Sequence, residues 1–381
     1  MKSYNHLFEK LIDRGNIALA INRASKRKKK RPEVKMIYDN PEKHIEAIID
    51  ILTNGKYKPQ THQMFRICDG SSRKERFIIQ PYFYRNQYAE IVYEQIIHHA
   101  VVQVLKPIIM RGMYQYSCGS IPNRGGHHGK KYLSKYIREH NGREIKYCLK
   151  LDIRHFYDSI DIDVMKNYFA SIIHDARMLE VINIMIDSNI AYYQDVVIDK
   201  GLRIGTYFVQ WFANFLLQGL DHYIKEDLRI KCYVRYVDDM VILAPNKRQL
   251  HEDFIKIKNY LDLHYGLKVK DNWQIFKFDY IDKNGRRKGR PIDYMGFKFY
   301  RDKTTLRKRI LKSSTRKARK IVKSKKLSAY ESGQIMSYRG WYKATDTYKY
   351  FKREIAGRVN FRKCRKAIRT RQIIQNKEIK K

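Results

Sequence analysis

Residues 231–244 read Lys-Cys-Tyr-Val-Arg-Tyr-Val-Asp-Asp-Met-Val-Ile-Leu-Ala, and they give the strongest indication of the fold. Two short runs of β-forming residues flank Asp238 and Asp239, which predicts a β-hairpin with both acids near its turn. Adjacent strand residues project to opposite faces, so only a turn exposes both carboxylates together. Because buried apolar strands do not tolerate paired carboxylates without neutralisation, the stretch predicts an acidic tip on a buried sheet.

A second apolar segment also ends in an acid. Residues 147–153, Tyr-Cys-Leu-Lys-Leu-Asp-Ile, predict a strand with Asp152 where the chain leaves the sheet. Hard divalent cations prefer oxygen ligands, and Mg²⁺ is held by one or two carboxylates plus substrate phosphates. Two ions about 4 Å apart can activate a hydroxyl and stabilise leaving pyrophosphate. We therefore predict a two-metal site from Asp152, Asp238 and Asp239; a surface turn with two solvated acids is the alternative.

The chain carries 79 Lys and Arg against 39 Asp and Glu, a formal net charge of +40 over 381 residues. Such an excess is usually offset by a polyanion, and nucleic acid fits best. A membrane-surface protein is the alternative. No run approaches the roughly 20 apolar residues of a spanning helix, and residues 1–16 lack the apolar core of a secretion signal, so we expect no membrane partner.

The five cysteines form no Cys-x-x-Cys pair, and their number is odd. We therefore expect neither a zinc site nor a disulfide framework, and a cytoplasmic location.

The remaining pattern mixes helices and strands without regular βαβ alternation, which predicts an α+β fold. The expected elements are helices at 4–22, 41–52, 88–105, 161–172 and 211–224, a hairpin from 64–68 and 73–80, a Gly-rich loop at 116–129 and a strand at 292–300. From residue 301 the chain is predicted to be helical. It is also basic, with 28 Lys and Arg against 5 Asp and Glu, a difference of +23 that indicates a separate subdomain.

Four segments together resemble the reverse transcriptase family. Tyr236-Val-Asp-Asp239 is similar to its catalytic hairpin, and Leu151–Tyr157 to its first catalytic strand. Gly201–Asn214 resembles the template- and nucleotide-contacting segment, and Tyr294–Phe297 the primer grip. The resemblance implies a right-hand polymerase with fingers, a palm built on an antiparallel sheet, and a helical thumb.

The chain is most similar to the bacterial branch of the family, which includes group II intron, retron, diversity-generating and defence-associated enzymes. Within this branch, Met295-Gly-Phe-Lys-Phe299 followed by Leu311-Lys-Ser-Ser-Thr-Arg-Lys-Ala-Arg-Lys320 most resembles the diversity-generating enzymes and their defence relatives. Two positions depart from the family, which usually has Pro at Arg203 and Ser at Val209. These departures favour antiphage defence with a non-coding RNA. A diversity-generating enzyme with a small helical accessory protein is the alternative.

For the metal site, the resemblance implies that Asp152 and Asp238 bind both ions and that Asp239 supports the second carboxylate position. Ile153, beside Asp152, is a further metal-contacting position. The implied cofactor is Mg²⁺ as two ions, with Mn²⁺ as a substitute.

The nucleotide-binding positions that the resemblance implies are Lys74, Arg76, Phe156, Tyr157, Gly205, Gln210 and Lys270. Lys74 and Arg76 match residues that grip the incoming triphosphate. Tyr157 matches the aromatic that excludes a 2′-hydroxyl, with an ordinary core residue as the alternative. Lys270 is a candidate for protonating pyrophosphate, with a solvated lysine as the alternative.

The implied nucleic-acid-binding positions are Arg124, Tyr236, Gly296, Phe297, Lys312, Arg316 and Lys317. Trp341, in the expected thumb, either packs between helices or stacks on a base, and core packing is favoured.

We thus expect an N-terminal helical, basic extension (1–60), fingers (61–146), a palm with finger insertions (147–300), and a basic helical thumb and tail (301–381). The expected function is an RNA-directed DNA polymerase that copies an RNA template into DNA from deoxynucleotides. We expect no RNase H or endonuclease domain, because the residues after the expected thumb are too few for one. A non-catalytic, maturase-like RNA-binding scaffold and an RNA polymerase are the rivals. The priming hydroxyl, and the choice between a homo-oligomer and an accessory protein, stay open.

Overall fold

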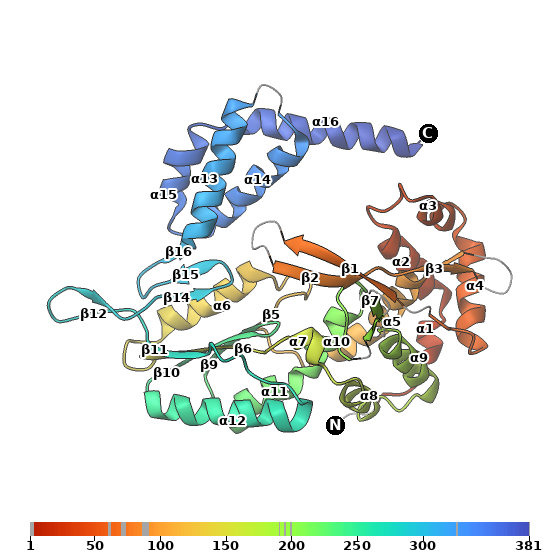
Figure 1. Cartoon of the computed structure of the whole chain (residues 1–381), viewed down its shortest axis with the longest axis horizontal. Helices are drawn as coiled ribbons and strands as arrows, with labels where there is room; N and C mark the ends of the chain where they lie inside the picture. Colours follow the sequence, from red (N-terminus) through yellow and green to blue (C-terminus); the bar gives the residue numbers. More distant parts are fainter. Residues whose placement is uncertain are drawn as a thin grey trace. The chain divides into compact units, whose positions relative to one another are not determined.

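The computed structural model describes residues 4–59, 62–69, 74–85, 91–189, 191–193, 196–198, 200–324 and 327–380 (Figure 1). The chain divides into two compact units. Unit 1 comprises Met1–Gln115, Asp152–Arg229 and Ile255–Asp271. Unit 2 comprises Tyr116–Leu151, Ile230–Phe254 and Asn272–Lys381.

Unit 1 is mainly helical. Its helices are α1 (Phe8–Leu11), α2 (Arg14–Ser25), α3 (Pro32–Asp39), α4 (Pro41–Thr53), α5 (Glu94–Arg111), α7 (Phe156–Ser159), α8 (Ile162–Ala170), α9 (Ala176–Asp187), α10 (Val209–Leu216), α11 (Gln218–His222) and the π-helical η1 (Tyr223–Asp227). The predicted helix at 41–52 is confirmed by α4. The predicted helix at 4–22 is divided instead, because Asp13 caps a new helix by accepting a hydrogen bond from the Asn16 amide.

The strands of unit 1 form a four-stranded sheet in the order β2-β1-β7-β8 and a separate β3–β4 pair. Their bounds are β1 (His62–Asp69), β2 (Lys74–Ile79), β3 (Phe83–Arg85), β4 (Ile91–Tyr93), β7 (Ala191–Tyr193) and β8 (Val196–Ile198). β1 and β2 pair antiparallel with Met64 opposite Ile79, which confirms the predicted hairpin. The helix predicted over 88–105 begins only at Glu94, because residues 91–93 pair as β4.

Unit 2 is built on a five-stranded sheet in the order β11-β6-β10-β9-β5. The strands are β5 (Ser117–Cys118), β6 (Tyr147–Asp152), β9 (Cys232–Tyr236), β10 (Asp239–Ala244) and β11 (Gln274–Lys277). β9 and β10 form an antiparallel hairpin, as predicted. The predicted loop at 116–129 is partly wrong, because it contains β5 and the first turn of α6 (Gly126–Glu139).

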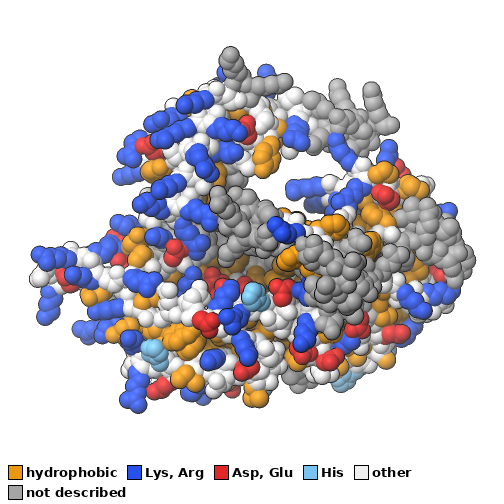
Figure 2. All heavy atoms as spheres, viewed as in Figure 1, with side chains coloured by type: hydrophobic (Ala, Val, Ile, Leu, Met, Phe, Trp, Pro, Cys, Tyr) orange, Lys and Arg blue, Asp and Glu red, His pale blue; other side chains and the backbone are white. Residues whose placement is uncertain are grey.

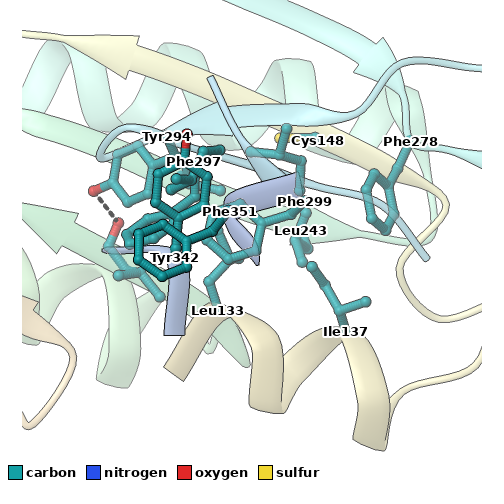
Figure 3. Packing of buried hydrophobic residues seen from close by; sticks show 14 of the residues in the cluster. Leu133, Ile137, Cys148, Leu243, Phe278, Tyr294, Phe297, Phe299, Tyr342 and Phe351 are labelled. Atoms are coloured by element: carbon teal, nitrogen blue, oxygen red, sulfur yellow. Dashed lines mark hydrogen bonds between the residues drawn. The ribbon is translucent and has the colours of Figure 1, made fainter. Parts of the chain in front are cut away.

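A second sheet of unit 2 has the order β14-β15-β16, with β14 (Ile292–Tyr294), β15 (Phe297–Phe299) and β16 (Thr304–Leu306). A single strand at 292–300 was the prediction, but Met295 and Gly296 have φ of 50° and 87° and turn the chain into a hairpin. Figure 3 shows Tyr294, Phe297 and Phe299 in one core cluster with Leu133 and Ile137 of α6. β12 (Tyr280–Ile281) and β13 (Arg287–Lys288) form a further pair.

The remaining helices of unit 2 follow β16. They are α13 (Lys308–Lys323), α14 (Ala329–Lys343), α15 (Tyr348–Phe351), the π-helical η2 (Lys352–Ala356) and α16 (Phe361–Lys380). The predicted helical tail is therefore correct except for β16. α13 buries Ser314, Thr315, Ala318 and Ile321, while Figure 2 shows Lys and Arg side chains crowded over its outer surface. α12 (Lys247–Tyr265) contributes residues to both units.

Candidate active site

The turn between β9 and β10 is Val237-Asp238, since Asp239 pairs directly with Tyr236. Val237 has a φ of 59°, a left-handed conformation that is unusual for a β-branched residue. Its amide donates a hydrogen bond to the Cys118 oxygen at 2.9 Å. The neighbouring parallel pairing of β5 with β9 thus helps to hold the turn in this strained form.

Arg235 lies beneath this turn and is fully buried. Its Nη1 donates a hydrogen bond to the main-chain oxygen of Val237 at 2.9 Å. A buried guanidinium is costly unless it has acceptors, and the Val237 oxygen in the turn is one of them. Both acids, Asp238 and Asp239, are half-buried.

Two side chains from other strands reach Asp239. The Lys150 ammonium of β6 lies 3.9 Å from Asp239 Oδ2. The Tyr294 hydroxyl of β14 donates a hydrogen bond to the Asp239 main-chain oxygen at 2.6 Å. Neither residue was predicted individually as a site residue, because only the tertiary fold brings them to the turn.

Asp152 is the last residue of β6, and β6 is the sheet neighbour of β10, which begins at Asp239. Lys270 makes two contacts with Asp152, one through its main chain and one through its side chain. Its amide donates to the Asp152 oxygen at 2.8 Å, and its ammonium contacts Asp152 Oδ2 at 2.5 Å. Lys270, predicted as a nucleotide-binding residue, is thus an ion-pair partner of a predicted catalytic acid in this structure.

The acidic side chains offer hard oxygen donors of the kind that Mg²⁺ takes. Asp152 Oδ1 is buried and has no hydrogen-bond partner among the described residues, which leaves one donor open for a cation. Asp152 and Asp239 each lie beside a lysine ammonium, so both carboxylates already attract positive charge. In the described part of the chain, no three His, Cys, Asp or Glu side chains are gathered as a ready metal-binding group.

Ile153 is fully buried and forms an isolated antiparallel bridge with Val269. Phe156 is also buried, whereas its neighbour Tyr157 is half-buried, with ring centroids 5.2 Å apart. The Tyr157 main-chain oxygen accepts a hydrogen bond from the Leu202 amide at 2.7 Å. The segment after β6 is thereby fastened to the segment that begins at Gly201.

Gly205 lies against the end of β2. A side-chain carbon at this position would sit 1.8 Å from the Ile79 oxygen, and its φ is +145°, so only glycine fits. The Gln95 side chain of α5 brackets the segment, because its Nε2 donates to the Gly205 oxygen and its Oε1 accepts from the Tyr207 amide. Gln210, another predicted nucleotide-binding residue, is half-buried at the start of α10.

Arg203, where the family usually has proline, is a buried structural residue. Its amide donates to Asn189 Oδ1, and its guanidinium donates to Asp158 Oδ1 at 2.5 Å and to the Lys200 oxygen. A proline here would remove both the amide donor and the ion pair. The departure from the family pattern therefore has a local structural reason.

The fingers positions Lys74 and Arg76 fall on β2, but their side chains lie outside the described residues.

The predicted nucleic-acid-binding residues differ in their exposure to solvent. Lys312 and Arg316 are exposed on α13, and Arg124, Tyr236 and Lys317 are half-buried. Phe297 is fully buried, with Trp341 5.0 Å away between ring centroids, so nucleic acid at this position would meet the main chain and not the ring. Gly296 accepts a hydrogen bond from the Arg307 amide. Trp341 is half-buried and also packs near His127 of α6, so these two contacts are with β15 and α6, whereas packing between thumb helices was the favoured prediction.

Within unit 1, a buried polar cluster was not foreseen. Glu94, at the start of α5, accepts a 2.8 Å hydrogen bond from His62 Nε2, and His98 Nε2 lies 3.6 Å from its other oxygen. Burial lowers the pKa of His98 to about 4, despite the opposing charge of Glu94. Burial also lowers the pKa of His62, but its hydrogen bond and ion pair with Glu94 outweigh burial and raise it overall.

None of the helices in the described ranges is long and apolar enough to cross a membrane.

Solved structures with a similar fold include apo telomerase from Candida tropicalis, with a TM-score of 0.50 and 13% identity over 76% of this chain and 52% of that chain. Telomerase from Candida albicans, solved with the TWJ fragment of telomeric RNA, has a TM-score of 0.46 and 14% identity over 69% and 51%. The chain therefore spans about half the length of these telomerase chains. At this identity the likeness concerns the fold, an α+β right-hand polymerase fold as predicted.

Residues 89–299, more than half of the chain, match the family described as reverse transcriptase (RNA-dependent DNA polymerase). The chain belongs to the reverse transcriptase family. The comparison with curated proteins found no match.

Proposed function

We propose that the chain copies an RNA template into DNA from deoxynucleoside triphosphates, with Asp152, Asp238 and Asp239 as the catalytic carboxylates. One observation carries the proposal. The strand that ends at Asp152 lies beside the strand that begins at Asp239 in one sheet, and a strained turn presents Asp238 directly before it.

In the proposed reaction, the primer 3′-hydroxyl attacks the α-phosphorus of the incoming nucleotide, a phosphodiester bond forms and pyrophosphate leaves. Two Mg²⁺ ions, which Mn²⁺ can replace, would be held by Asp152, Asp238 and Asp239 with Ile153 beside them, and they supply charge stabilisation for hydroxyl and pyrophosphate. The protein positions these carboxylates on rigid strands, which lowers the cost of orienting the reacting groups. Lys270, placed at Asp152, is proposed to donate a proton to the departing pyrophosphate.

The residues of unit 1 around Gly205 are proposed to line the nucleotide pocket, with Gln210 and with Tyr157 as the filter against ribonucleotides. The exposed cations of α13 are proposed to hold the phosphates of the template–product duplex. On this reading, residues 61–146 form the fingers, 147–300 the palm and 301–381 the thumb.

For the biological setting, we propose a cytoplasmic enzyme of the bacterial branch that copies a dedicated non-coding RNA in antiphage defence. The departures from the family pattern at Arg203 and Val209 support this setting over gene diversification. Sequencing the RNA and DNA that copurify with the protein tests it. A single structured RNA is the expected template, whereas the transcript of a variable gene would contradict the proposal.

Primer extension tests the activity. The wild-type chain should extend a DNA primer on an RNA template, and Asp238→Ala should abolish incorporation. Asp262→Ala, which removes an exposed carboxylate on α12, is the matched control and should remain active. Equal incorporation by wild type and Asp238→Ala would remove the proposed site. RNA binding with no incorporation by the wild type would favour the scaffold alternative.

A further inference from the structure

Lys150 joins the acidic turn to the β14–β15 hairpin within unit 2. It lies two residues before Asp152, so both side chains project from the same face of β6. Its ammonium donates a hydrogen bond to the main-chain oxygen of Asp293 at 2.9 Å and lies 3.9 Å from Asp239 Oδ2. The Lys150 and Asp239 side chains are 30% and 29% exposed, so water screens this pair only partly.

Asp293 is in turn held from the base of α13. The Arg307 Nε donates to Asp293 Oδ1, and the Arg307 amide donates to the Gly296 oxygen at 3.0 Å. Arg307 is the residue that directly precedes α13. Lys150 therefore belongs to a chain of polar contacts. The chain runs from the Asp239 carboxylate through Lys150 and Asp293 to Arg307 at the start of α13.

The two contacts of Lys150 differ in strength. The contact with the Asp293 oxygen is a hydrogen bond of ordinary length, whereas the Asp239 carboxylate is too far for one. The ammonium can therefore lose Asp239 to a competing cation and still keep a partner, which avoids leaving an unpaired, partly buried charge.

We propose that Lys150 is a positioning residue that acts as the counter-cation of Asp239 until a divalent ion binds there. This inference rests on the proposed function, because it assumes that Asp239 faces a metal ion. Lys150 keeps the carboxylate in place in the metal-free enzyme, at the cost of weaker metal binding, because its charge repels the incoming cation. Through its hydrogen bond to Asp293, the same lysine links the position of the Asp239 carboxylate to the β14–β15 hairpin and to the start of α13.

Metal binding to the full chain, without nucleotide or primer, provides a readout apart from activity. Mn²⁺ is titrated into the protein and free Mn²⁺ is followed by electron paramagnetic resonance. Lys150→Met, which keeps the length of the side chain but removes its charge, should bind Mn²⁺ about 3- to 10-fold more tightly than wild type. Lys150→Arg, which keeps the charge, should bind as wild type does.

Lys146→Met is the matched control, because Lys146 is exposed near the start of the same strand and lies over the Tyr147 ring at 5.6 Å. It removes the same charge and should leave Mn²⁺ affinity unchanged. If Lys150→Met fails to fold, Lys150→Gln takes its place with the same expectation. Unchanged or weaker binding in the folded variant overturns the role of Lys150.

Asp239→Ala separates this inference from the proposed function. If wild type binds Mn²⁺ and Asp239→Ala does not, the site holds metal and the Lys150 variants decide the inference alone. If Asp239→Ala binds as well as wild type, the metal role of Asp239 is wrong, and the inference falls with it.

Discussion

The Tyr294 hydroxyl donates a hydrogen bond to the main-chain oxygen of Asp239 at 2.6 Å and lies 3.3 Å from that of Val234. The Tyr294 ring is fully buried in the core cluster drawn in Figure 3, and burial raises the pKa of its hydroxyl well above the usual value. Through Tyr294, the β14–β15 hairpin therefore contacts both strands of the acidic hairpin, at one main-chain oxygen of β9 and one of β10. The predicted primer grip and the predicted catalytic turn are thus mechanically connected inside unit 2.

Replacing Tyr294 with Phe should destabilise the chain and slow nucleotide incorporation. The Asp239 main-chain oxygen would lose the hydrogen bond from Tyr294, which costs about 1–3 kcal/mol of unfolding free energy. Chemical denaturation measures the loss. Tyr330→Phe, at a side chain that is 66% exposed, is the control and should change stability by less than about 0.5 kcal/mol. Similar values for both variants would mean that the hydroxyl bond is unimportant.

Gly205→Ala should be far more damaging than the same change at a glycine of positive φ that has open space around it. The added carbon would overlap the Ile79 oxygen, so we expect a loss above about 3 kcal/mol or failure to fold. Gly285→Ala shares the positive φ but meets nothing within 4 Å, and should cost only about 1–2 kcal/mol. Thermal unfolding of both variants makes the comparison; equal costs would contradict the steric argument.

Buried His98 should make stability fall as the solution is acidified. Its pKa is about 4 in the folded chain against about 6.5 when unfolded, so the unfolded state gains its proton first as pH falls. Between pH 7 and pH 5 this group alone should remove about 2 kcal/mol. The raised pKa of His62 acts in the opposite sense, since its contribution is complete at low pH and is lost as pH rises.

Comparing variants isolates this effect. His98→Gln should be less stable overall. Its unfolding free energy should fall less steeply than that of the wild type between pH 7 and pH 5, because the contribution of His98 is removed. His174→Gln changes an exposed histidine of the same unit and should keep the wild-type slope. A wild-type slope in His98→Gln would show that other groups cause the acid sensitivity.

Tyr157→Ala should admit ribonucleotides, because the half-buried ring after β6 is proposed to exclude the 2′-hydroxyl. We expect the preference for deoxynucleotides to fall by about tenfold or more, as for loss of a shape-selective contact. Single-nucleotide incorporation with each substrate measures the ratio. Tyr157→Phe retains the ring and should retain the preference. A wild-type enzyme that already favours ribonucleotides would contradict the deoxynucleotide assignment.

Removing Lys312 and Arg316 together from α13 should weaken binding to a template–primer duplex and flatten its salt dependence. Two lost phosphate contacts should reduce the slope of log K against log salt by about 2. Lys256→Ala with Lys258→Ala removes two exposed charges from α12 and should leave the slope unchanged. Equal slopes for the two double variants would argue against a duplex contact at α13.

Two predicted elements were wrong because a local backbone conformation interrupts the hydrophobic pattern. Hydrophobic periodicity over 4–22 suggested one helix, but the Asp13 cap starts a new one. The apolar run at 292–300 suggested one strand, but Met295 and Gly296 adopt positive φ and form a turn. Periodicity averages over several residues, so it cannot detect a cap or a two-residue turn within an apolar run.

Local sequence patterns were enough to predict the acidic hairpin, the strand that ends at Asp152, the excess of positive charge and the order of the motifs. These features depend on neighbouring residues and on the strand or helix period. The folded chain was needed to show that Lys150 and Tyr294 contact Asp239, that Arg235 is buried, and that His62 pairs with Glu94. Such contacts join residues as far apart as Lys150 and Asp293, and they depend on strand order and packing. No short-range pattern encodes them.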